Sequence, residues 1–149
     1  MKIVLILLIT FGSSVTIADG QFGVFDFQVR RFVYEAKLQG VKVNTQRLRI
    51  EFMPGLPHRW LAACFNMGSY YPYIGVDRYV WERSGSLRKE YTIFHEMGHC
   101  ILNRNHDTRL KDGYHPISIM YPDDRVIDNS QYYLEYRAEY MHELFHPNK

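Results

Sequence analysis

A short run of residues near position 95 combines the side chains that metal chemistry requires. The run reads His95-Glu96-Met97-Gly98-His99. Residues four apart lie about one turn apart on the same face of an α-helix, so both imidazoles can reach one metal ion. Zn²⁺ accepts histidine nitrogens at ~2.0–2.1 Å and lowers the pKa of a bound water toward ~7. The carboxylate of Glu96 flanks this position, where it can take a proton from the zinc-activated water without ligating the ion.

A third histidine, His106, follows seven residues after His99. On a continuing helix it would lie about 10 Å further along the axis, too far away to share the metal. The helix is therefore expected to end and the chain to turn back at Asn103-Arg104-Asn105, because asparagine tolerates the left-handed conformation of helix C-termini. Three histidines leave one tetrahedral position open, which is typical of a catalytic zinc site. The neighbouring Asp107 is the alternative third ligand.

These residues resemble the pattern of the metzincin zinc endopeptidases, H-E-x-x-H-x-x-G-x-x-H followed by a methionine-containing turn. His95, Glu96, His99 and His106 match the ligands and the base of that family. Downstream, Ser118-Ile119-Met120-Tyr121-Pro122 is similar to the turn. The chain departs from the family in two ways, since the third histidine comes one residue later and no glycine occupies the turn between the second and third histidines.

The resemblance implies a zincin-like α+β fold and a secreted zinc metalloprotease that acts on a protein or peptide substrate. Glu96 would act first as general base and then as general acid. Met120 would support the metal site without ligating the ion, and Tyr121 would either assist at the oxyanion or pack below the site. An edge strand within residues 60–80 would bind the extended substrate through backbone hydrogen bonds.

Two other interpretations stay open. In gluzincin-type enzymes the third ligand is a glutamate from a later helix, for which Glu135 and Glu139 are the candidates. A binding or inhibitory module of the same fold would hold zinc structurally, or hold no metal, and would have no need of Glu96. The other histidines match no ligand spacing, and they stand at positions 58, 115, 142 and 146.

The elements that must position these residues follow from the hydrophobic pattern. Apolar residues at helical spacing predict helices over 25–38, 87–102 and 130–145. The expected strands are 47–52, 60–65 and 73–80. Ser84-Gly85-Ser86 is expected to supply a turn and the N-cap of the second helix. Residues 103–128 show no strong period, and the order of the elements predicts a single α+β domain.

The N-terminus has the pattern of a secretory signal peptide, which is expected to span residues 1–18. Lys2 is followed by an apolar run that reaches Phe11, and small or polar residues continue to Ala18. The apolar run is too short for a membrane-spanning helix, which needs ~20 residues. An uncleaved N-terminal anchor is the alternative. The mature chain, residues 19–149, is expected to be a secreted or periplasmic monomer.

The composition fits one globular domain. The chain has 149 residues, of which 46% are hydrophobic and 23% charged, and this excludes an intrinsically disordered protein. The net charge of +2 is spread along the sequence, so nothing favours a nucleic-acid or membrane-surface partner. The two cysteines, Cys64 and Cys100, lack the C-x-x-C spacing of a zinc site. The sequence leaves open whether they form a disulfide or remain buried thiols.

Overall fold

The computed structural model of the protein describes residues 20–57, 60–123, 125–128 and 130–147. The predicted signal peptide lies outside these residues. Within the described ranges, none of the helices combines the length and the apolar character that crossing a bilayer requires.

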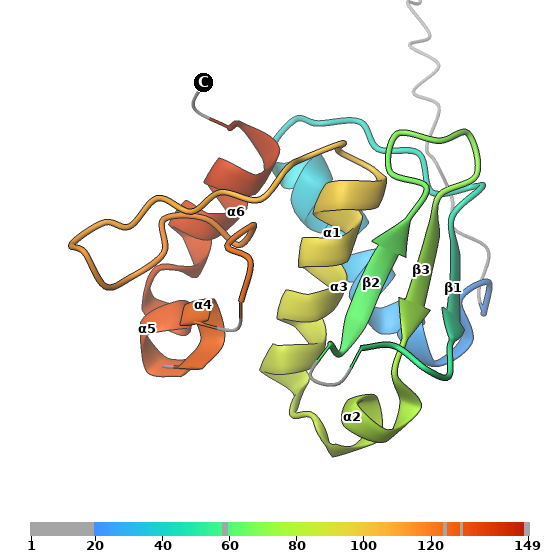
Figure 1. The fold of residues 1–149 in the computed structure, drawn as a ribbon. Coiled ribbons are helices and arrows are strands. Elements are labelled where there is room, and N and C mark those ends of the chain that lie inside the picture. Colours follow the sequence, from blue (N-terminus) through green and yellow to red (C-terminus); the bar gives the residue numbers. More distant parts are fainter. Residues whose placement is uncertain (1–19, 58–59, 124, 129, 148–149) are drawn as a thin grey trace, which may run out of the picture.

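The described residues form a mixed three-stranded sheet in the order β1-β3-β2 (Figure 1). Its strands are β1 (Arg49–Phe52), β2 (Ala62–Phe65) and β3 (Tyr73–Val76). The central strand β3 runs parallel to β1 and antiparallel to β2, so β1 and β2 are the edges. Leu48 and Ile50 are buried, as their alternation with charged residues predicts, and Phe52 is half-buried.

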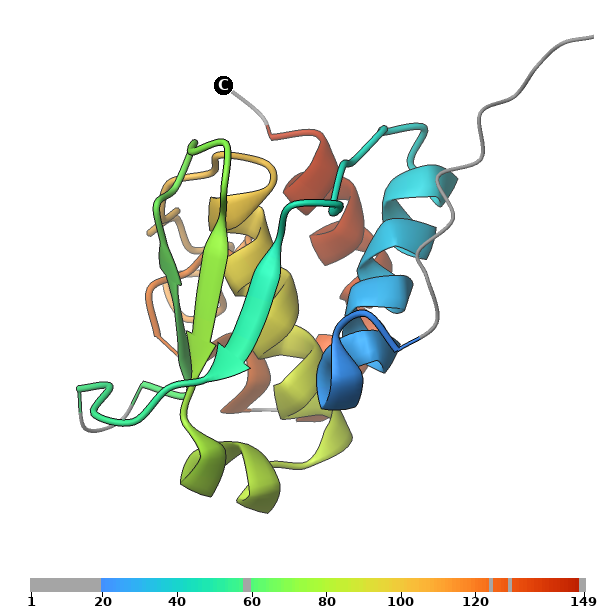
Figure 2. The same ribbon diagram turned by 90° about the vertical axis from the view of Figure 1, so that its right-hand side faces the viewer.

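Helices α1 (Asp26–Leu38) and α3 (Ser86–Cys100) lie on one side of the sheet. Figure 2 shows that α3 packs on β2 and β3 and that α1 packs beside α3, on its side away from these strands. A short 3₁₀ turn, η1 (Gly23–Phe25), precedes α1. Phe32 of α1 and Phe94 of α3 meet edge to face, with 5.3 Å between their ring centroids. Such aromatic contacts add to the apolar area that the two helices bury.

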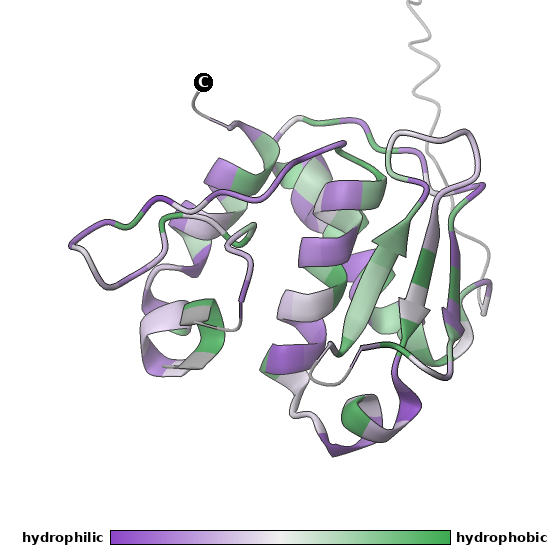
Figure 3. Cartoon of the chain, in the orientation of Figure 1, coloured by the Kyte–Doolittle hydropathy of each residue, from purple (hydrophilic) through white to green (hydrophobic). Residues whose placement is uncertain are grey.

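The C-terminal third of the chain covers the other side of α3. Its helices are α4 (Arg125–Asp128), α5 (Ser130–Glu135) and α6 (Arg137–Phe145). The segment between α3 and α4 runs without regular secondary structure, apart from one isolated bridge between Leu110 and Pro116. In Figure 3 this segment is largely hydrophilic, whereas β2 is hydrophobic along its length. The observed mixture of helices and a small sheet confirms the predicted α+β class.

Several of the predicted boundaries were wrong, and the strands expected from positions 47 and 60 begin only at Arg49 and Ala62. The strand expected over 73–80 ends at Val76, and α2 (Arg78–Arg83) follows, because the side chain of Asp77 caps it by accepting a hydrogen bond of 2.8 Å from the N–H of Val80. Helix α3 begins after Gly85, and no serine side chain caps it. The helix expected over 130–145 is interrupted at Tyr136, which separates α5 from α6.

A buried ionic cluster joins α3 to helices α1, α5 and α6. The carboxylate of Glu90 pairs with Arg31 at 2.9 Å and with Arg137 at 2.8 Å, and it accepts a hydrogen bond of 3.1 Å from the hydroxyl of Tyr133. Arg137 also pairs with Glu35 of α1 at 2.7 Å. Because the burial of one charge costs free energy unless another compensates it, this cluster fixes how α3 packs on α1, α5 and α6.

Cys64 and Cys100 form a disulfide, which answers the question that the sequence leaves open. The bridge joins the edge strand β2 to the last residue of α3, across 36 positions of the chain. The open edge of the sheet and the end of this helix are therefore covalently linked.

Candidate metal centre

Helix α3 carries three of the predicted site residues. His95 and Glu96 are buried, each with 8% of its surface exposed, and His99 is half-buried. The two histidines lie one turn apart, as the spacing predicts, and their ring centroids are 4.8 Å apart.

Backbone carbonyls fix the orientation of both imidazole rings. Nδ1 of His95 lies 2.8 Å from the carbonyl oxygen of Ile119, and Nδ1 of His99 lies 2.6 Å from that of Arg104. A carbonyl oxygen can only accept a hydrogen bond, so each Nδ1 must carry the proton. Both Nε2 atoms are then unprotonated, so each ring is in the tautomer that a metal ion needs. Their lone pairs point into the space between the two rings.

The chain turns back directly after α3 and brings the third histidine to the site. Asn103 adopts a left-handed conformation with φ of 54°, so the predicted reversal is confirmed. The N–H of Arg104 then bonds to the carbonyl of Gly98 at 2.9 Å, and the N–H of Asp107 bonds to the carbonyl of Met120 at 3.0 Å. These two bonds hold the intervening His106 over α3.

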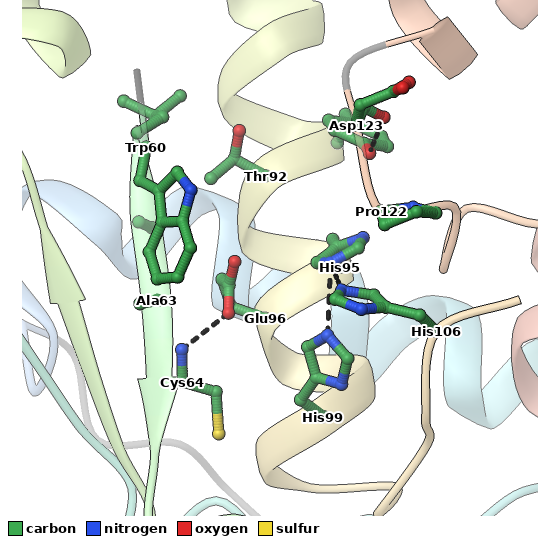
Figure 4. Close-up of a pocket in the computed structure, with 13 residues that line it drawn as sticks. Trp60, Ala63, Cys64, Thr92, His95, Glu96, His99, His106, Pro122 and Asp123 are labelled. Carbon is green, nitrogen blue, oxygen red and sulfur yellow. Dashed lines mark hydrogen bonds between the residues drawn. The ribbon is translucent and has the colours of Figure 1, made fainter. Parts of the chain in front are cut away.

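The three histidine nitrogens converge on one point (Figure 4). Nε2 of His95 lies 3.1 Å from Nε2 of His99 and 3.3 Å from Nε2 of His106. A tetrahedral zinc ion with bonds of ~2.0–2.1 Å would set its ligand nitrogens ~3.3 Å apart, which matches these two separations, and all three nitrogens lie within 4.8 Å of one another. Three imidazoles in this arrangement can hold a metal ion.

The electrostatics of the site favour neutral histidines. Burial, together with the neighbouring His99 and His106, lowers the pKa of His95 to about 3, against the opposing effect of the Ile119 carbonyl. Burial also lowers the pKa of His99 and of His106. The rings are therefore uncharged at neutral pH, and their lone pairs are available to a cation.

The structure does not bring the alternative ligands to this point. The carboxylate of Asp107 is paired with Arg109, at 2.6 Å from Nη2, and this contact lowers the pKa of Asp107. Glu139 is exposed and pairs with Lys111 at 3.4 Å, and Glu135 is exposed as well. Within the described part of the chain, the group of residues placed to hold a metal consists of the three histidines at 95, 99 and 106.

Glu96 lies beside the metal position, between α3 and β2. Its Oε2 accepts a hydrogen bond of 2.6 Å from the backbone N–H of Cys64 (Figure 4). Burial raises the pKa of Glu96 to about 7, and the Cys64 N–H opposes this shift. The carboxyl group can therefore both take up and release a proton near neutral pH.

A cleft of about 700 Å³ opens over these groups. One wall is β2 with the preceding Trp60, and the opposite wall includes His106 and Pro122 (Figure 4). The N–H of Asp77 bonds to the carbonyl of Leu61 at 2.8 Å, so the backbone groups of residue 61 point toward the chain of β3. Backbone groups alternate along a strand, so those of Ala62 and Cys64 point away from β3, toward the cleft.

Met120 and Tyr121 pack around the site and do not line the cleft. Met120 is fully buried, and its sulfur lies where a Cβ on Gly98 would have to be. The glycine thus lets the methionine approach the backbone of α3 between the two histidines. Tyr121 is buried with 7% of its surface exposed, which favours the packing role over assistance at an oxyanion.

Comparisons of the chain with protein-family models, curated proteins and solved structures found no match. A function is therefore inferred from the side chains and backbone groups at the site. They comprise three neutral imidazoles, one carboxyl group that can exchange a proton, and a cleft beside an open strand edge.

The sequence patterns did not indicate the residues that hold the backbone segments around the site. Arg104 and Glu143 form a nearly buried ion pair at 2.6 Å, and Ser118 donates a hydrogen bond to the same glutamate. No local signal indicates these contacts, because Arg104 and Glu143 are 39 positions apart. The packing of Gly98 on Met120 was missed for the same reason.

Proposed function

We propose that the protein is a secreted, monomeric zinc endopeptidase of the metzincin type. The observation that carries this proposal is the convergence of three histidine Nε2 atoms beside a buried glutamate in an open cleft. His106 as third ligand and Met120 packed against Gly98 support the metzincin type over the gluzincin type. The disulfide supports an oxidising compartment, where such bonds persist.

Three imidazoles suit zinc and leave a fourth position on the side of the cleft. A zinc ion bound there would polarise the scissile carbonyl and make water a stronger nucleophile. His95, His99 and His106 would hold the ion as neutral ligands. The carbonyls of Ile119 and Arg104 would keep the first two rings in the required orientation.

Glu96 would move the proton during hydrolysis. Its Oε2 is held by the N–H of Cys64, which leaves Oε1 to take the proton from the attacking water. The same oxygen would then return the proton to the amine that leaves when the peptide bond breaks. Burial raises the pKa of Glu96 in the metal-free site, and the charge of a bound zinc ion would oppose this shift and keep the carboxylate ionised, ready to accept the proton.

The edge of β2 would bind the substrate as an additional strand. The outward backbone groups of Ala62 can pair with an extended peptide, while β3 satisfies the inward groups of the neighbouring residues. The bound peptide would then run along the cleft, with one carbonyl beside the metal position and Glu96. An extended, unfolded segment fits this edge better than a helix does.

The decisive test is the digestion of a diverse peptide library by residues 19–149, with cleavage read by mass spectrometry. We expect internal cuts by the wild type and none by Glu96→Ala, while both proteins retain zinc. A folded, zinc-loaded wild type that makes no cuts would indicate a binding module instead. Loss of zinc from Glu96→Ala would contradict the role given to this residue. A hydroxamate chelator should bind the wild type, since an open fourth position accepts it and a closed structural site does not.

A further inference from the structure

The two carbonyls that orient His95 and His99 lie in irregular segments of the chain. Ile119 and Arg104 both belong to the stretch between α3 and α4, which has no helix or strand to fix its backbone. A ligand that depends on such a carbonyl keeps its orientation only if other contacts hold the segment. The side chains around these carbonyls provide those contacts.

One carboxylate on α6 reaches both segments. Glu143 is buried, with 8% of its surface exposed. Its Oε1 lies 2.6 Å from Nη2 of Arg104, and its Oε2 accepts a hydrogen bond from the hydroxyl of Ser118. Ser118 immediately precedes Ile119, and its oxygen also accepts a bond of 3.0 Å from the N–H of Met120.

The guanidinium of Arg104 completes the link to α6. Its Nη1 donates to the carbonyls of Glu143 at 2.9 Å and of Leu144 at 2.7 Å, near the C-terminal end of the helix. The side chains of Arg104 and Glu143 are 11% and 9% exposed, so little water is available to replace either partner. A charge left unpaired at this depth would force the segment to move or the group to lose its charge.

We propose that Glu143 is a positioning residue of the metal centre, a role that rests on the proposed zinc-binding function. Through Arg104 it holds the carbonyl behind His99, and through Ser118 it holds the carbonyl behind His95. A single side chain on the C-terminal helix thereby sets the orientation of two ligands. Partners of this kind, behind the ligands, typically change metal affinity by ~10–100-fold when they are removed.

Glu90 provides a matched control on α3 itself. It is as buried as Glu143, with 3% of its surface exposed, and it also pairs with arginine, at 2.9 Å from Arg31. Its partners, however, are the side chains of Arg31, Tyr133 and Arg137, and within the described residues no histidine donates to any of these three. Glu90→Gln should therefore destabilise the fold in a similar way without disturbing the ligands.

The experiment compares the full chain with its variants Glu143→Gln, Ser118→Ala and Glu90→Gln. Zn²⁺ affinity is measured by competition with a chromogenic chelator, and the absorption spectrum of bound Co²⁺ reports the geometry of the ligands. The thermal midpoint without metal reports stability. We expect ~10-fold weaker Zn²⁺ binding and an altered Co²⁺ spectrum for Glu143→Gln. Ser118→Ala removes both hydrogen bonds of the Ser118 hydroxyl and keeps the ion pair, so it should shift both readouts in the same direction by less.

Glu90→Gln should lower the thermal midpoint and leave the Zn²⁺ affinity and the Co²⁺ spectrum at wild-type values. Equal effects of Glu143→Gln and Glu90→Gln on affinity would overturn the positioning role, as would wild-type affinity in both Glu143→Gln and Ser118→Ala. If Glu143→Gln does not fold, the Ser118→Ala comparison alone decides the question. A folded wild type that binds no Zn²⁺ would overturn the proposed function as well, so the two failures are distinguishable.

Discussion

The backbone N–H of Cys64 donates a hydrogen bond of 2.6 Å to the carboxylate of Glu96, although the residues are 32 positions apart. The same cysteine is bonded through its sulfur to Cys100, which directly follows His99. The edge strand is thus connected to α3 at two points, one at the proposed base and one beside a proposed ligand. This arrangement fixes one carboxylate oxygen and leaves the other for proton transfer.

Replacing the carboxyl group of Glu96 by an amide should remove proton transfer while keeping the hydrogen bond to Cys64. Glu96→Gln keeps an oxygen that can accept from Cys64, but the amide cannot take up a proton. We expect peptide turnover to fall by ~10²–10⁴-fold while zinc content and the thermal midpoint stay near wild type. Kinetics on a peptide identified in the library digest would measure the change. Glu82→Gln, at an exposed glutamate of α2, serves as the control and should keep full turnover.

Removing the third histidine should remove most of the metal. We expect His106→Ala to lose its zinc during gel filtration, because the two histidines of α3 alone make a weak site. His115→Ala, at a histidine paired with Asp112 on the surface, should keep the metal. Zinc would be measured by mass spectrometry of the eluted protein. Retention by His106→Ala together with loss from Glu139→Ala would favour the gluzincin alternative instead.

The reversal after α3 should depend on a left-handed residue. Asn103 has a φ of 54°, which costs an ordinary L-residue roughly 1–2 kcal/mol. We therefore expect Asn103→Val to lower the free energy of unfolding by about that amount and to weaken zinc binding, because His106 follows the turn. Asn103→Gly should keep both properties near wild type. Urea unfolding and chelator competition would test this, and equal behaviour of the two variants would contradict it.

A methyl group at Gly98 should disturb the packing beneath the site. The added Cβ would meet the sulfur of Met120, and it would lie 3.2 Å from Cδ1 of Leu144. Overpacking of this kind typically costs ~1–3 kcal/mol. We expect Gly98→Ala to be destabilised by a similar amount, and the same change to cost less in a Met120→Ala background. Urea unfolding of the four proteins measures the coupling, and strictly additive effects would show that the contact is unimportant.

The disulfide should contribute substantially to stability. It closes a loop across 36 positions, for which chain entropy gives a stabilisation of ~4 kcal/mol. We expect the double variant Cys64→Ala/Cys100→Ala to unfold at a lower urea concentration than the wild type. Dithiothreitol should shift the wild type toward the double variant and leave the double variant unchanged. Coincident unfolding curves for oxidised wild type and double variant would contradict this estimate.

Local patterns predicted the parts of the molecule that depend on neighbouring residues. The periodicity of α1 and α3, the alternation around Ile50 and the reversal at Asn103 all arise within a few residues, and the structure confirms them. The capping of α2 by Asp77 was also local, and an aspartate three residues before Val80 was the signal that could have indicated it.

The parts that could not be predicted depend on residues brought together from distant positions. The convergence of the three histidines on one point could be predicted, because helical spacing and one reversal suffice for that inference. No sequence pattern indicated that Glu143 would reach Arg104 and Ser118, since that contact exists only after α6 packs behind α3. The pairing of the cysteines likewise required the Cα atoms to come within 5.7 Å, a distance that tertiary packing decides.

The disulfide between β2 and α3 also determines what proteolytic cleavage of the chain would release. It encloses His95 and His99 in a covalent ring, whereas His106 lies outside. A nick inside the ring leaves both pieces attached, but a nick at the exposed Asn105 would leave His106 on a fragment held by packing alone. If the protein is the proposed endopeptidase, self-digestion at this short segment would inactivate it, because the third proposed ligand would be lost while the disulfide-closed ring stayed intact.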